Sequence, residues 1–223
     1  MPDNKIITDR EEMLEAIKNN PWALQYADDS LKTDREFVLE AVRIDGNALK
    51  DADETLWADR KFVLEAVRNN GSALEYADDT LKADREVVLE AVRNDGNALQ
   101  YAEDTLKADR EVVLEALNDD GHVLDYSPLQ FANIKFTSDP EKMLEALKID
   151  PETIEYADKD LFTDHNFMLN AIKIDEACVE YAGEKLWGNR EFVIETMKLD
   201  IYNLEFASEE LKNDPELKKL LEG

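Results

Sequence analysis

The sequence predicts an all-α solenoid of about eight 25-residue helix-turn-helix repeats, followed by a short capping helix at the C-terminus. Three observations predict this fold class. One aspartate position recurs every 25 residues, and a second position that is always Asp or Asn recurs between its copies. Proline occurs directly after both positions but never inside the predicted helices.

The first helix of each repeat begins at the aspartate of an Asp-Arg-Glu pattern. In the unit 84–108, Asp84 is the predicted N-cap, because its carboxylate can accept a hydrogen bond from an unpaired N–H of the first turn. Apolar residues follow on more than one side of this helix, as in a helix between two neighbours. The repeats begin at Asp9, Asp34, Asp59, Asp84, Asp109, Asp139, Asp164 and Asn189, and a shorter terminal unit begins at Asp214.

The second helix of each repeat begins after the other recurring polar position. The next residue is glycine in several copies and proline at Pro21 and Pro151, and proline is favoured at the first position of a helix. The sequence therefore predicts a second capped helix in every unit. The predicted caps are Asn20, Asp45, Asn70, Asp95, Asp120, Asp150, Asp175 and Asp200.

The repeats form one predicted domain, residues 1–223, because no linker rich in Gly, Pro or Ser interrupts them. A unit of 25 residues cannot bury its apolar face alone, so consecutive units must stack. The spacing is broken once, by a five-residue insertion within 127–138. The capping segment begins at Asp214.

The repeat pattern resembles a known family. The pattern D-R-E-F-V-L-E-A-V-x-x-x-G-x-A-L-x-Y-A-x-x-x-L-K-x-D is similar to the repeats of the family called domain of unknown function 4116, and it covers Asp9 to Asp214. Departures are Asp51 at the tyrosine position, Glu176 and Ile201 at the glycine position, and the insertion. The resemblance implies a bacterial multi-repeat module, found also in some secreted effectors, and it implies no catalytic residues.

The net charge of −27 limits the classes of partner. Nucleic acids and anionic membranes are polyanions, so the charge argues against direct binding to either and permits a basic protein partner. The single Cys178 excludes an internal disulfide and suits a reducing compartment. No signal peptide or transmembrane run is apparent, so we expect a cytoplasmic protein, with delivery as a secreted effector left open. A monomer is slightly favoured.

Acidic residues recur in the turn after the second helix. In the unit 84–108 every acid except Glu103 and Asp104 has a predicted structural role, and Asp78 and Asp79 occupy the same positions one unit earlier. A solenoid would align these pairs along one edge, where they could bind a basic partner. The other interpretation is a solvated turn, or the start of another helical turn.

The insertion and several aromatic residues are further candidates for partner binding. The insertion adds Phe131, Ile134 and Phe136, either on a binding face or as a buried adjustment between repeats. Trp57 and Trp187, like Phe162, stand where other units have lysine, and Trp22 and Tyr202 stand where Asn97 stands. They would be interface anchors if exposed, and otherwise they pack over a neighbouring unit.

The sequence shows no catalytic or metal-binding motif. His122 and His165 are each alone in their units, and Cys178 replaces a small core residue, so we expect a buried thiol. We therefore predict no enzyme, no cofactor and no metal. The predicted function is a non-catalytic protein–protein interaction scaffold that recognises a basic partner, and the alternative is a polyanionic nucleic-acid mimic or decoy. An enzyme fragment is a third hypothesis.

Overall fold

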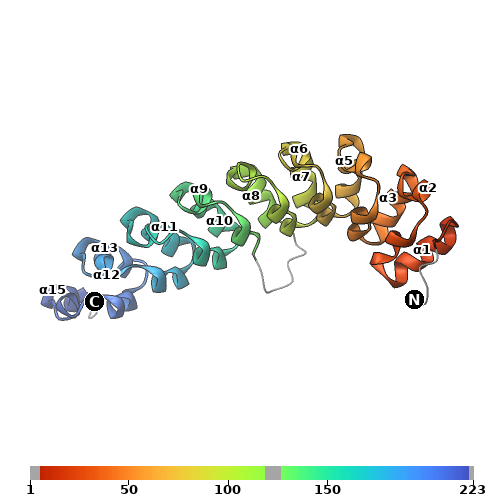
Figure 1. Cartoon of the computed structure of the whole chain (residues 1–223). Helices are drawn as coiled ribbons and strands as arrows, with labels where there is room; N and C mark the ends of the chain where they lie inside the picture. Colours follow the sequence, from red (N-terminus) through yellow and green to blue (C-terminus); the bar gives the residue numbers. More distant parts are fainter. Residues whose placement is uncertain (1–5, 119–126, 221–223) are drawn as a thin grey trace. The chain divides into compact units, whose positions relative to one another are not determined.

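The computed structural model describes residues 6–118 and 127–220, which consist of helices and short connections. Within these ranges the one pairing of extended backbone is an isolated parallel bridge between Ile7 and Ala27. The prediction of an all-α helical repeat solenoid is confirmed (Figure 1). The chain divides into two compact units, unit 1 (Met1–Asn133) and unit 2 (Ile134–Gly223). The predicted cap Asp120 and His122 lie outside the described residues.

Three kinds of helix alternate along the chain: a long α-helix, a 3-10 helix (η) and a short third helix. In unit 1 they are α1 (Arg10–Asn19), η1 (Pro21–Tyr26), α2 (Asp29–Lys32), α3 (Arg35–Ile44), η2 (Gly46–Asp51), α4 (Glu54–Trp57), α5 (Arg60–Asn69), η3 (Gly71–Tyr76), α6 (Asp79–Lys82), α7 (Arg85–Asn94), η4 (Gly96–Tyr101), η5 (Leu106–Ala108), α8 (Arg110–Leu117) and η6 (Pro128–Phe131). In unit 2 they are α9 (Ile134–Thr137), α10 (Pro140–Ile149), η7 (Pro151–Tyr156), η8 (Leu161–Thr163), α11 (His165–Ile174), η9 (Glu176–Tyr181), α12 (Glu184–Trp187), α13 (Arg190–Met197), η10 (Ile201–Phe206), α14 (Glu209–Lys212) and α15 (Pro215–Leu220).

Both predicted cap positions form the expected hydrogen bonds to the backbone of the helix that follows. The carboxylate of Asp84 accepts from the backbone N–H of Glu86 at 3.0 Å, and that of Asp95 accepts from Asn97 at 3.0 Å. The long helix that follows Asp84 buries apolar side chains on several sides, and the second helix buries Leu99. The second helix is a 3-10 helix, in which side chains three residues apart lie on one face.

The acidic turn is a third short helix, which the two-helix prediction lacked. The carboxylate of Asp78 accepts from the backbone N–H of Thr80 at 2.9 Å, and Glu103 accepts from Thr105 at 2.8 Å. The interpretation that Asp78 and Glu103 lack a structural role is therefore wrong: the first acid of each pair caps this turn. Both acids of each pair are exposed, and the side chain of the second acid is 100% exposed at Asp79 and 79% exposed at Asp104.

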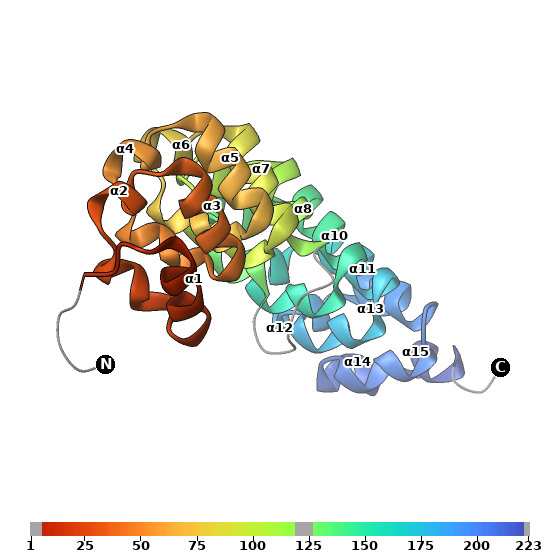
Figure 2. The ribbon, with the colours of Figure 1, turned by 90° about the vertical axis from the view of Figure 1, so that its right-hand side faces the viewer.

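A backbone hydrogen bond joins successive third helices. The N–H of Asp78 donates to the carbonyl of Trp57 at 3.0 Å, and that of Glu103 donates to Lys82 at 3.0 Å. The same bond recurs in unit 2, where Gly183 donates to Phe162 at 2.8 Å. These bonds fix the spacing of the third helices along one edge, which Figure 2 shows for α2, α4 and α6.

Ion pairs connect successive long helices, and they give the Asp-Arg-Glu pattern a second role. Arg60 Nε lies 2.7 Å from Asp84 Oδ2, and another nitrogen of its guanidinium lies 2.5 Å from Glu86 Oε2. Arg85 forms the same two contacts with Asp109 and Glu111, at 3.2 and 2.5 Å. Many of the acids are thus partners for the arginine of the preceding repeat.

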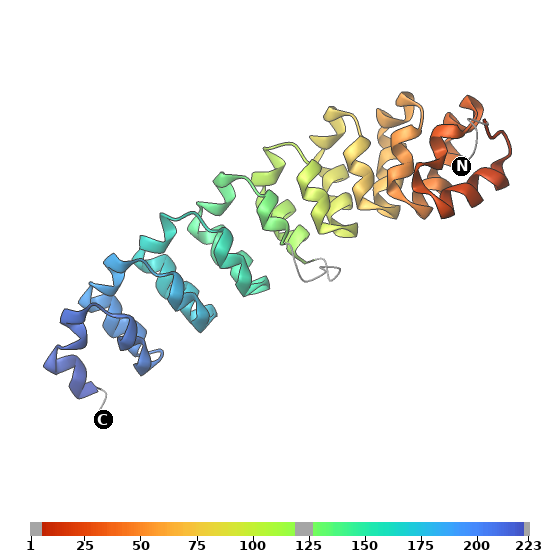
Figure 3. The same cartoon turned by 60° about the horizontal axis from the view of Figure 1, so that its bottom comes forward.

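Glycine permits close packing of the 3-10 helices in unit 1. A Cβ on Gly71 would lie 2.5 Å from the carbonyl oxygen of Ala91, and one on Gly46 would lie 2.5 Å from Cγ of Asn70. In unit 2 the same position holds Pro151, Glu176 and Ile201, and the backbones of successive 3-10 helices approach less closely. Figure 3 shows the closer spacing of the ribbons in unit 1.

The C-terminal capping helix is present as predicted. It is α15, capped by Asp214, whose carboxylate accepts from the N–H of Glu216 at 2.8 Å. Lys218 and Lys219 are exposed at the positions where α7 buries Val88 and Leu89. The outer face of α15 is therefore polar where that of α7 is apolar, which is the pattern of a capping repeat.

Candidate partner-binding surface

The second acids of the pairs form an exposed row along the third helices of unit 1. The side chain of Asp79 is fully exposed, and that of Asp104 is 79% exposed. A lysine one turn later lies near each of them, with Lys82 Nζ 3.8 Å from Asp79 and Lys107 Nζ 4.0 Å from Asp104. These lysines partly neutralise the row at both places.

A hollow of about 420 Å³ lies between α2 and α4, at the same edge. Its lining is Asp29, Lys32, Ala52, Asp53, Glu54 and Thr55. Within the described residues the carboxylates of Asp29 and Glu54 have no ion pair. Trp57 replaces the lysine that would follow Glu54 by one turn, and Lys32 Nζ donates instead to the carbonyl of Gln25 at 3.1 Å. Asp29 and Glu54 therefore lack the lysine contact that Asp79 and Asp104 have, although Lys32 also lines the hollow.

Local hydrogen bonds and burial shift the pKa values of two carboxylates near this hollow, those of Asp53 and Asp51. The hydroxyl and the backbone N–H of Thr55 lower the pKa of Asp53, so this cap stays ionised. Asp51, which stands at the tyrosine position, is partly buried, and burial raises its pKa against the opposing effects of Lys32 and Lys50. The negative charge inside the hollow thus comes from Asp29, Asp53 and Glu54.

The aromatic residues singled out in the sequence differ in exposure. Trp57 is half-buried, and its Nε1 donates to the carbonyl of Leu49 at 3.0 Å. Trp187 is buried, with its ring stacked on Phe206 at 5.4 Å between centroids. Phe206 belongs to the following repeat, so Trp187 packs over a neighbouring repeat, the second of the two interpretations, and is not an exposed anchor. Trp22, 50% exposed, lies under Lys50 at 5.0 Å.

The insertion residues also separate into exposed and buried ones. Phe136 is completely buried in unit 2, so it is not available to a partner and fits the interpretation of a buried adjustment. Ile134, at the start of α9, is 57% exposed. Phe131, at the end of η6 in unit 1, is half-buried. Only Ile134 offers a largely exposed apolar side chain.

No group of three or more His, Cys, Asp or Glu side chains in residues 6–118 and 127–220 is arranged to hold a metal ion. His165 Nε2 lies 2.7 Å from Glu195 Oε2, where other repeats have the arginine of the ion-pair ladder. Cys178 is buried as predicted, and burial raises the pKa of its thiol to about 11.

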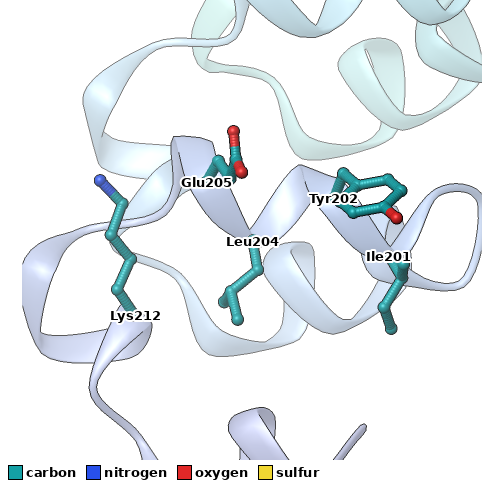
Figure 4. Close-up of a pocket in the computed structure, with 5 residues that line it drawn as sticks. All are labelled: Ile201, Tyr202, Leu204, Glu205 and Lys212. Carbon is teal, nitrogen blue, oxygen red and sulfur yellow. The ribbon is translucent and has the colours of Figure 1, made fainter. Parts of the chain in front are cut away.

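A second hollow, of about 540 Å³, lies against η10 in unit 2 (Figure 4). It is lined by Ile201, Tyr202, Leu204, Glu205 and Lys212. Two departures from the repeat pattern lie here, Ile201 at a glycine position and Tyr202 at an asparagine position, but the pattern did not indicate that they meet at one surface. Tyr202 is 71% exposed.

None of the helices in the described part of the chain combines the length and the apolar character needed to cross a membrane. Comparison with family models matches seven segments, most of them overlapping, to a family described as a domain of unknown function (DUF4116): residues 9–57, 34–82, 59–107, 84–131, 109–162, 164–212 and 189–219. Most of these segments span two consecutive repeats. The searches of curated proteins and of solved structures found no match.

Proposed function

Because the chain belongs to the DUF4116 family, whose description assigns no activity, we propose a function from its surface: a non-catalytic, cytoplasmic scaffold that binds a basic segment of a partner protein. The hollow between α2 and α4 carries this proposal. A lysine or arginine side chain of the partner would enter it between Asp29 and Glu54. The single thiol, buried at Cys178, suits the reducing cytoplasm.

The repeat geometry extends this site along the edge. Asp79 and Asp104 continue the row, each at the same place in its repeat, and backbone hydrogen bonds hold the third helices in register. A partner with several spaced basic side chains can therefore contact several repeats at once, so that weak contacts combine into a higher affinity. Complementary charge also raises the rate of association.

The test uses a fluorescein-labelled ten-residue peptide of alternating lysine and glycine, titrated with the full chain. The double variant Asp29→Asn, Glu54→Gln removes the two unpaired charges and keeps their shape. We expect the affinity to fall about tenfold in low salt, with a smaller difference in high salt, where exposed charges are screened.

The matched control is the double variant Glu184→Gln, Glu209→Gln. These residues begin α12 and α14, the corresponding helices of unit 2, so the change in net charge is the same. The proposal requires the control to bind the peptide as the wild type does. If both double variants weaken binding equally, binding follows total charge, as expected of a polyanionic nucleic-acid mimic, and the hollow has no special role.

A further inference from the structure

The long helices of unit 2 each end near a lysine that is followed by an apolar residue. Ile149 is 38% exposed and Leu199 is 45% exposed, while Ile174 is half-buried. The helices α10, α11 and α13 pack side by side (Figure 2), and the pairs recur at the same place in each repeat. These residues form a surface, the lysine–apolar strip, made of Lys148, Ile149, Lys173, Ile174, Lys198 and Leu199.

In unit 1 the cations at these positions are paired. Arg68 Nε lies 3.0 Å from Glu90 Oε2, and Arg93 Nε lies 3.0 Å from Glu115 Oε1. Each arginine thus contacts a glutamate of the following long helix. These contacts form a second ladder of ion pairs, separate from the one that Arg60 and its equivalents form at the start of the long helices.

The second ladder is missing from the described part of unit 2. Asn170 stands where the glutamate that would pair with Lys148 is expected. Glu195, the equivalent residue one repeat later, contacts His165 Nε2 at 2.7 Å. Within residues 127–220 none of the three lysines of the strip forms an ion pair or a side-chain hydrogen bond. Their positive charges are therefore left without a partner, in a chain whose net charge is −27.

The apolar residues of the strip replace a polar residue that has a structural role in unit 1. The side chain of Asn94 donates to the carbonyl of Arg68 at 3.1 Å and accepts from the N–H of Gly71 at 2.6 Å. Isoleucine and leucine can form neither bond. The helix dipole favours a lysine at a C-terminus, but it does not account for apolar residues exposed beside each lysine. Apolar surface bordered by charge is typical of an interaction site.

The charge of the whole chain limits what can occupy this strip. A membrane or a nucleic acid is a large polyanion and would be repelled by the net charge of −27. A short segment can lie within about 8 Å of the strip, the screening length at physiological salt, so its charges interact mainly with the three lysines. Carboxylates complement these lysines, and apolar side chains complement the residues beside them.

We propose that the lysine–apolar strip binds a short, extended segment of a partner protein, in which an acidic residue followed by an apolar one recurs every third position. Neighbouring helices pack about 8–10 Å apart. A polyproline II segment advances about 9 Å per turn of three residues, so successive carboxylates reach successive lysines. The apolar residue lies a third of a turn away and faces the apolar row. This surface is distinct from the acidic hollow of unit 1, and the proposal does not depend on that hollow.

The test is an NMR titration of the ¹⁵N-labelled full chain at physiological salt with a capped peptide of four repeats of aspartate, leucine and proline. Proline favours the polyproline II conformation. We expect saturable shifts at the amides of the strip. A control peptide of the same composition, with its four aspartates consecutive, should bind at least about fivefold more weakly, because its carboxylates no longer match the spacing of the helices.

Variants of the lysines separate this interaction from a general effect of charge. The double variant Lys148→Gln, Lys173→Gln should weaken the peptide about tenfold, because exposed charges that are paired on binding are lost. The matched control is Lys159→Gln, Lys185→Gln, which removes two other exposed lysines of unit 2, outside the strip. This control changes the net charge equally and should bind the peptide as the wild type does.

Variants of the apolar row test the second part of the recognition. The double variant Ile149→Asn, Ile174→Asn introduces the residue that unit 1 has at Asn69 and Asn94. The affinity for the leucine peptide should fall about fivefold, because apolar contacts are lost. A peptide with serine in place of leucine should bind the double variant and the wild type equally, since it has no apolar side chain to lose.

Four outcomes would overturn the proposal. The first is no saturable shift at about 5 mM peptide, a concentration that detects millimolar affinity. The second is an equal effect of the two lysine double variants. The third is sedimentation of the chain with phosphatidylserine vesicles that Lys148→Gln, Lys173→Gln abolishes, since a lipid surface would then be the ligand. The fourth is a dimer that the same variant disperses, since the acidic surface of a second copy would then occupy the strip.

Discussion

Unit 1 and unit 2 are built from the same repeat but pack their 3-10 helices differently. In unit 1, glycine begins η2, η3 and η4, and successive 3-10 helices lie close together. In unit 2 the corresponding residues are Pro151, Glu176 and Ile201, and the spacing is wider. Glycine accompanies the close stacking of η2, η3 and η4, although η1, which begins at Pro21, also packs closely on η2.

The largest expected effect compares two equivalent leucines. Leu99 is completely buried between 3-10 helices of unit 1, whereas Leu204 occupies its position beside the hollow at η10. Leu99→Ala should cost about 3 kcal/mol of unfolding free energy, because the closely packed neighbours cannot fill the cavity. Leu204→Ala should cost about half as much. Urea unfolding measures both free energies. Equal losses in the two variants would mean that the two leucines are packed equally tightly in the two units.

A smaller effect is expected from adding one methyl group at a glycine. Gly71→Ala places its Cβ against the backbone oxygen of Ala91 and should cost about 2 kcal/mol, because the next repeat must move away. In Gly188→Ala the new Cβ meets no atom closer than 3.6 Å, so this variant is the control and should change stability little. Similar unfolding curves for the two variants would remove glycine as the cause of close packing.

The smallest expected effect concerns the ion-pair ladder of unit 1. The hydrogen bond from Arg60 lowers the pKa of Asp84, as does the backbone N–H of Val87, although burial acts in the opposite direction. Because the pKa of Asp84 is lower in the folded state, its ionised carboxylate stabilises the fold at every pH above the ordinary pKa of aspartate. That stabilisation is lost as the pH falls through the folded-state pKa.

NMR titration of the Asp84 carboxyl group measures this contact directly. Arg60→Met should raise the pKa of Asp84 toward its ordinary value, because the guanidinium is gone. Lys61→Met makes the same change in net charge one residue later and should leave that pKa where it is in the wild type. A pKa that moves equally in both variants would mean that net charge, and not the ladder, controls Asp84.

The local features of the fold could be predicted from the sequence, because they depend on neighbouring residues. A cap such as Asp84 needs only the next few residues, and a proline such as Pro151 fixes the start of a helix wherever the segment packs. The ladder could not be predicted in the same way. Arg60 and Asp84 are 24 residues apart, and they meet only because successive long helices are parallel neighbours.

The candidate sites were predicted in part. The acidic row was expected from Asp79 and Asp104, but the hollow lies at Asp29 and Glu54, where Trp57 takes the place of a lysine. The sequence shows tryptophan at position 57, but it does not show that Glu54 is thereby left without an ion pair. The hollow at η10 could not be predicted, because it brings Ile201 and Tyr202 together with Lys212 of another helix.

The sequence by itself determined the repeat, both cap positions, the all-α class and the strongly acidic surface, because each follows from local chemistry repeated at a fixed interval. The tertiary structure decided which equivalent side chains are exposed. Trp57 and Trp187 occupy the same place in the pattern, yet Trp57 stays half-buried while Trp187 is covered by Phe206. Burial depends on what the next repeat places against a residue, and the spacing between repeats sets that contact.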